Sequence, residues 1–122
     1  MKNQAYRMAL LYDFYGDMLT DRQKEFYDLY YNEDLSLAEI AENYGITRQG
    51  VRDVIVRAEA VLTELEDKTG IIKRFHKMQD QFSQIETAVA AILKRNDEKW
   101  QDNELELQCN RIQELLAALK QE

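Results

Sequence analysis

The stretch SLAEIAENYGITRQGVRDVI, residues 36–55, decides the fold of this chain. It opens with Ser36 and Glu39, three residues apart, which form a capping box at the start of a short helix. Ala41 supplies a small side chain where two helices can cross, and Gly45 can adopt the positive φ that a tight turn needs. This spacing predicts a helix-turn-helix rather than an ordinary pair of core helices.

The branched apolar residues of the stretch fall where both helices would face a common core. The predicted core positions of the motif are Ile40, Ala41, Gly45, Ile46, Val51 and Val54. The second helix would begin at about Thr47, and its first turns would project polar side chains away from this core. We expect the DNA-facing residues to be Thr47, Arg48, Gln49, Arg52, Asp53 and Arg57.

These residue types suit the reading of base edges. Recognition helices use their N-terminal residues in the major groove, where Arg and Gln form paired hydrogen bonds with guanine and adenine. Arg57, further along the same helix, would contact a phosphate. The alternative is an ordinary solvated helix face, because three exposed arginines are common on soluble helices.

Helical periodicity continues on both sides of the motif. Residues 5–19 carry one apolar face, and Thr20 with Gln23 forms a second capping box. Gly70 is well placed to end the helix that starts near residue 47. No strand pattern competes, so the sequence predicts an all-α chain. Residues 1–69 would form a helix-turn-helix unit of three to four helices, winged-helix-like in its helices.

Residues 70–122 are expected to form a helical extension, either a hairpin or an arm. From Ile71 to Ile92, apolar residues alternate steps of four and three in a heptad stripe, and a last stripe runs from Leu105 to Leu119. The two helices could pair with each other as an antiparallel hairpin. A surplus of large apolar residues in both of them favours a homodimer held by the C-terminal half instead.

Composition narrows the functional classes. The 122-residue chain has a net charge of −7, which argues against a protein that coats nucleic acid without specificity. The single cysteine, Cys109, excludes an intramolecular disulfide framework and suits a reducing cytoplasm. His76 has no cluster of metal ligands or catalytic groups around it in the sequence. We therefore expect a cytoplasmic protein that is not an enzyme, with no cofactor, no metal and no membrane insertion.

The segment from Leu19 to Leu62 resembles the promoter-reading fourth region of bacterial sigma factors. More specifically, the runs RMALLYDFYGDMLTDRQ and LYYNEDLSLAEIAENYGITRQGVRDVIVRAEAVL resemble the YlxM family of small bacterial proteins. Members are usually encoded beside the signal-recognition-particle GTPase and are described as DNA-binding or regulatory accessory proteins. The resemblance implies that Arg48, Gln49 and Arg52 face DNA. Gly50 departs from the pattern, because a helix former such as alanine is expected there.

Two classes of function follow from these observations. The protein is either a sequence-specific DNA-binding regulator or an interaction module that contacts the signal recognition particle through its GTPase or its RNA. The acidic net charge favours the second class. The sequence does not separate them.

Overall fold

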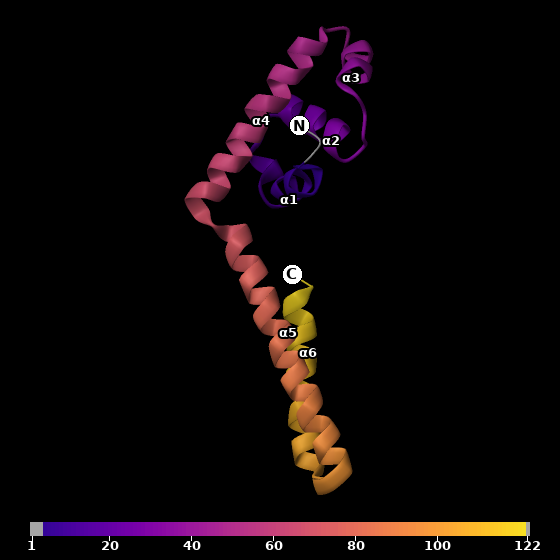
Figure 1. Cartoon of the computed structure of the whole chain (residues 1–122), viewed down its shortest axis with the longest axis vertical. Coiled ribbons are helices and arrows are strands. Elements are labelled where there is room, and N and C mark those ends of the chain that lie inside the picture. The colour runs from indigo at the N-terminus through magenta and orange to yellow at the C-terminus, as the bar shows by residue number, and fades with distance from the viewer. Residues whose placement is uncertain (1–3, 122) are drawn as a thin grey trace. The chain divides into compact units, whose positions relative to one another are not determined.

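The chain is helical throughout the part that this computed structural model describes, residues 4–121 (Figure 1). The elements are α1 (Ala5–Tyr15), the 3₁₀ turn η2 (Gly16–Met18), α2 (Asp21–Tyr31), α3 (Leu37–Tyr44), α4 (Arg48–Thr69), α5 (Ile71–Arg95), the π-helical turn η3 (Asn96–Trp100) and α6 (Asn103–Lys120). The predicted all-α class is confirmed. No strand, and therefore no wing, occurs between residues 4 and 121.

Local sequence signals set the ends of these helices. Both predicted capping boxes form: the Thr20 side chain accepts from the Gln23 backbone N–H at 3.2 Å, and the Ser36 side chain accepts from that of Glu39 at 3.1 Å. A glycine with positive φ follows α3 and another follows α4, in agreement with the sequence. Each cap satisfies backbone groups that a helix end would otherwise leave unpaired.

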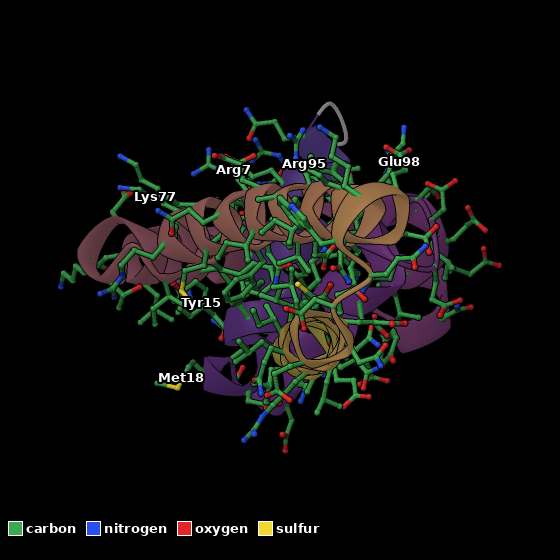
Figure 2. All side chains as sticks on the ribbon, turned by 90° about the horizontal axis from the view of Figure 1, so that it is seen from below. Arg7, Tyr15, Met18, Lys77, Arg95 and Glu98 are labelled. Atoms are coloured by element: carbon green, nitrogen blue, oxygen red, sulfur yellow. The ribbon has the colours of Figure 1, made fainter. Side chains whose placement is uncertain are left out.

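The first four helices enclose one apolar core. Figure 1 shows α1, α2 and α3 on the same side of α4, which contacts all three. The fully buried side chains of this core include Leu11, Phe26, Tyr27, Ile40, Val51, Ile55 and Leu62. The Tyr27 hydroxyl donates a 2.7 Å hydrogen bond to the Met8 carbonyl, so this buried polar group is satisfied. By contrast, Met18 is 67% exposed and projects away from the ribbon (Figure 2).

The last two helices, α5 and α6, form an antiparallel hairpin, the arrangement that the sequence left open beside a homodimer. Side chains fill the space between them in Figure 2. The connection is organised by buried Asn96, whose side chain donates to the Asp102 carbonyl at 3.0 Å and accepts from the Asp102 N–H at 2.9 Å. Asp102 in turn caps α6 by accepting from the Leu105 N–H at 3.1 Å.

The apolar stripe predicted from Ile71 to Ile92 divides into two rows. In α5, the first seam, which faces α6, includes the buried Val89 with half-buried Phe82, Glu86 and Leu93. Glu86 forms a 2.9 Å ion pair with Lys120 of α6 across this seam. The other row is exposed: Met78, Ile85 and Ile92 are 49%, 44% and 42% accessible. The predicted stripe therefore contains one row that α6 covers and one that it leaves exposed, a division that periodicity alone does not show.

Contacts divide the chain into an N-terminal unit that ends at Ile72 and a C-terminal unit that begins at Lys73. The end of the N-terminal unit is fixed by hydrogen bonds around Glu66. Its carboxylate accepts from the Tyr15 hydroxyl at 2.7 Å and from the Ile72 N–H at 2.9 Å. Among the described helices, none has the length and hydropathy of a membrane span.

Candidate nucleic-acid interface

The predicted helix-turn-helix consists of α3, the turn at Gly45 and the first half of α4. The predicted core residues Ile40, Ala41 and Val51 are buried at the crossing of the two helices, and Ile46 and Val54 pack against them half-exposed. Gly45 adopts φ 66°, and the N–H of the next residue bonds to the Ala41 carbonyl at 3.1 Å. The turn is therefore closed by the backbone of the small residue at the crossing.

Thr47 fixes the start of α4. Its backbone is extended, and its hydroxyl accepts the Gly50 N–H at 2.9 Å, which satisfies one unpaired donor of the first turn. A Cβ added at Gly50 would lie 3.1 Å from this hydroxyl oxygen. Glycine at this position therefore leaves room for the cap, and α4 begins at Arg48.

Three of the predicted DNA-facing residues surround one hollow. Arg48, Gln49 and Arg52 are exposed, and with Leu37 they line a shallow depression of about 350 Å³. Asp53 is exposed beside them and accepts a 3.0 Å hydrogen bond from the Gln49 side-chain amide. This bond holds the Gln49 amide in one orientation, and the charge of Asp53 partly offsets that of the arginines.

Arg57 does not belong to this hollow. It is exposed, but five residues of α-helix turn it about 140° around the axis from Arg52. The predicted set therefore divides into a cluster at the start of α4 and a separate cation further along the helix. Arg57 therefore faces a different side of α4 from the cluster.

The arginines of this surface have no directly bonded carboxylate partner in the described chain. Within residues 4–121, Arg48, Arg52 and Arg57 form no ion pair. Lys24, in contrast, is paired with Asp17 at 2.6 Å.

Two nearby carboxylates are held by tyrosines. Glu59 of α4 accepts from the Tyr31 hydroxyl at 2.6 Å, and Glu25 accepts from the Tyr44 hydroxyl. Burial first, and then the bond to Glu59, raises the pKa of Tyr31 well above its ordinary value. Tyr31 therefore remains a neutral donor that holds Glu59 on the core side of α4.

Leu37 is the residue of this surface that the sequence did not single out. It is the first residue of α3 and directly follows the cap Ser36, so its position could have been read from the capping box. As a half-buried apolar side chain beside two arginines, it can contact an apolar group such as the methyl of thymine.

A metal site requires several ligating side chains close together. No group of three or more His, Cys, Asp or Glu side chains is placed in the described residues to hold a metal ion. His76 is exposed, and Cys109 is a buried free thiol in the seam between α5 and α6. Burial of Cys109 agrees with its place on the apolar stripe of α6.

Comparison with known proteins adds the family. Residues 2–107 match the model of the UPF0122 family, described as "Putative helix-turn-helix protein, YlxM / p13 like". A UPF0122 protein of Desulforamulus reducens is 53% identical over 72 residues, which cover 59% of this chain and 62% of that protein. One from Thermoanaerobacter is 44% identical over 88 residues, covering 72% and 75%.

A third relative covers most of both chains. A UPF0122 protein of Listeria monocytogenes is 40% identical over 104 residues, which are 84% of this chain and 92% of that protein. The predicted resemblance to the YlxM family is confirmed by these matches together with the observed helix-turn-helix. The chain belongs to the UPF0122 family of YlxM-like helix-turn-helix proteins.

Proposed function

We propose that this protein is a cytoplasmic, sequence-specific DNA-binding regulator without catalytic activity, which places the start of α4 in a major groove. The observation that carries the proposal is the hollow at Arg48, Gln49 and Arg52. It brings together one side-chain amide and two cations that form no ion pair in the described chain. All three lie at the start of α4, the second helix of the helix-turn-helix. Recognition helices present such residues to base edges.

The division of the surface suggests separate roles for its residues. Arg48 and Arg52 would read guanine edges, and Gln49, oriented by Asp53, would read adenine. Arg57 lies apart from them and would bind a phosphate, which carries no sequence information. The acidic net charge keeps non-specific attraction low, so most of the affinity would depend on base contacts.

We further propose that the chain acts as a homodimer held by its C-terminal unit. The exposed apolar row on α5 supports this, since a hairpin of two helices covers only one side of each. Two copies would suit a target made of two half-sites that are related by two-fold symmetry.

A selection experiment tests the DNA proposal. Random duplexes would be incubated with the full-length chain, bound duplexes recovered and sequenced, and the affinity for the enriched site measured against an unrelated duplex at two salt concentrations. We expect an enriched motif, with affinity for it at least about a thousandfold above that for the unrelated duplex. No enrichment, together with no binding at low salt, would contradict the proposal.

The second candidate function is an accessory role in the signal recognition particle pathway, as the resemblance to the YlxM family implies. The net charge of −7 favours its form in which the GTPase is contacted, because an acidic protein gains little from the phosphates of DNA or RNA. The same titration with the particle's GTPase and RNA separates the two functions. An apolar protein contact changes little with salt, whereas binding to either nucleic acid weakens steeply as salt rises.

A further inference from the structure

The exposed row of α5 belongs to a second heptad pattern. Together with the exposed residues beside it, this row forms a line in which successive residues are alternately three and four positions apart. This part of the second seam comprises Met78, Gln81, Ile85, Ala88, Ile92 and Arg95, all exposed. Such spacing keeps side chains in a line along a helix, and helices that carry it pack against a partner. Since α6 already occupies the first seam, this line is available to a different helix.

Helix α6 carries a second seam as well. Its members are Leu105, Gln108, Ile112, Leu115 and Leu119, again at steps of three and four. Ile112, Leu115 and Leu119 are 41%, 58% and 49% exposed, although residues of the first seam on the same helix, Cys109 and Leu116, are buried. Apart from the half-buried Leu105, the second seam of each helix is therefore exposed, whereas the first seam is covered.

The two uncovered seams lie on the same face of the hairpin. Ile85 lies one residue before Glu86, and Leu119 lies one residue before Lys120, where Glu86 and Lys120 are paired across the first seam. Reversing a helix reverses the sense in which its residues wind. In an antiparallel pair, the residues that come one position before the covered seam therefore lie on the same side of both helices. The two second seams thus form one continuous surface two helices wide.

None of the second-seam residues is acidic, although the protein has 23 acidic residues. Two carboxylates border the face: Asp80 and Glu104 accept 2.9 Å hydrogen bonds from the side-chain amides of Gln84 and Gln108. In α5 and α6, the carboxylates occupy other positions: Asp80, Glu86, Glu104, Glu106 and Glu114. The single charge among the second-seam residues is Arg95, at the end of α5. Two copies of a protein with a net charge of −7 repel each other, and the second seams, which carry no acidic residue, are where they can approach.

The surface also has the relief that a helix contact requires. A hollow of about 440 Å³ is lined by Gln81, Gln84, Ile85 and Ala88, together with Phe82. The first four stand at positions i, i+3, i+4 and i+7, the set that forms a hole for one side chain of a facing helix. Beside this hole, Met78 and Leu115 protrude as side chains that could fill such a hole in another copy.

We propose that the second seams of α5 and α6 bind the same face of a second copy, which gives a four-helix bundle. A two-fold interface pairs one surface with itself, and this surface supplies both holes and protruding side chains. The face is as long as the 18-residue helix α6, about 27 Å, and as wide as two helices, roughly 20 Å. Its area as a flat rectangle is on the order of 500 Å². This approaches the roughly 600 Å² per partner of small specific interfaces. This face is the contact surface of the homodimer proposed above, so its assignment rests on that proposal.

Sedimentation equilibrium of the full-length chain at micromolar concentration tests the interface. The face variant is Ile85→Glu/Leu115→Glu, and its matched control is Ala90→Glu/Ala117→Glu, which adds the same two charges to exposed positions on the opposite side of the same helices. We expect the parent chain and the control variant to be dimers with similar dissociation constants. The face variant should raise the dissociation constant by more than about a hundredfold, because each copy would bury two unpaired carboxylates.

Folding is monitored separately, by circular dichroism of each variant. If the glutamates reduce helix content, Ile85→Gln/Leu115→Gln takes their place, with an expected loss of about tenfold or more in dimer affinity. A monomeric parent chain would overturn the inference, as would a face variant that remains as dimeric as its control. DNA binding is scored independently: a monomer that selects a motif refutes only the interface, and a dimer that selects none refutes only the DNA proposal.

Discussion

The two units bury their apolar residues to different extents. In the N-terminal unit, α4 is covered by three helices, and side chains such as Phe26, Tyr27 and Ile55 are fully inaccessible. In the C-terminal unit, the buried apolar residues of the described chain are Val89, Cys109 and Leu116. Apolar side chains spaced seven residues apart, Met78, Ile85 and Ile92, remain exposed. A unit with a closed core can present a polar surface to a ligand, whereas a two-helix hairpin with a second apolar face is suited to association.

The largest expected effect compares one phenylalanine from each unit. Phe26→Ala should cost about 3–5 kcal/mol of unfolding free energy, because it leaves a cavity in a closed core. Phe82→Ala, at a half-buried position, should cost about 1–2 kcal/mol. Urea unfolding followed by circular dichroism reports the whole chain, and the fluorescence of Trp100, the single tryptophan, reports the hairpin. Equal losses would show that the two cores are equally closed.

The next effect concerns space at a helix crossing. Ala41→Leu should destabilise the N-terminal unit by roughly 1–3 kcal/mol, since the added carbons have no room where α3 meets α4. Ala90→Leu makes the same change at an exposed position of α5 and should stay within about 0.5 kcal/mol. Thermal and urea unfolding of both variants measure the difference. A silent Ala41→Leu would mean that the crossing is not tightly packed.

Backbone strain gives a somewhat smaller effect. Gly45→Val should cost about 1–2 kcal/mol, because a β-branched residue is strained at φ 66°. No atom lies within 4 Å of a Cβ built there, so the cost comes from the backbone alone. Gly45→Asn is the control and should lose clearly less, since asparagine tolerates this conformation. Equal melting temperatures for the parent chain and the valine variant would contradict the assigned turn.

The smallest expected effect is the loss of a helix cap in the hairpin. Asp102→Ala removes the acceptor of the Leu105 N–H and should cost about 1 kcal/mol. The reference is Thr47→Ala, which removes the equivalent cap of α4 and should cost about the same. Trp100 fluorescence should respond to the first change alone. A response of this fluorescence to Thr47→Ala would mean that the units unfold together.

Much of the N-terminal unit could be predicted from sequence, because its signals are local. The capping boxes at Thr20 and Ser36 and the positive φ at Gly45 follow from short-range rules, and each is present. The hairpin was harder. Periodicity identified α5 but merged Phe82 and Ile85 into one seam, since only the position of α6 shows which row it covers.

The candidate site was predictable in part. The start of α4 and the exposure of Arg48, Gln49 and Arg52 follow from the motif. The hydrogen bond from Gln49 to Asp53 and the participation of Leu37 depend on side-chain positions that the residue spacing does not determine.

The central claim is that the start of α4 reads DNA, and paired charge removals test it most directly. Affinity for the selected duplex would be measured for Arg48→Ala/Arg52→Ala and for Lys77→Ala/Arg111→Ala, which removes the same charge from exposed positions of the hairpin. The first variant should lose more than about thirtyfold, from two base contacts, and the second less than about threefold. Equal losses in the two variants, or unchanged binding by the first, would contradict the account.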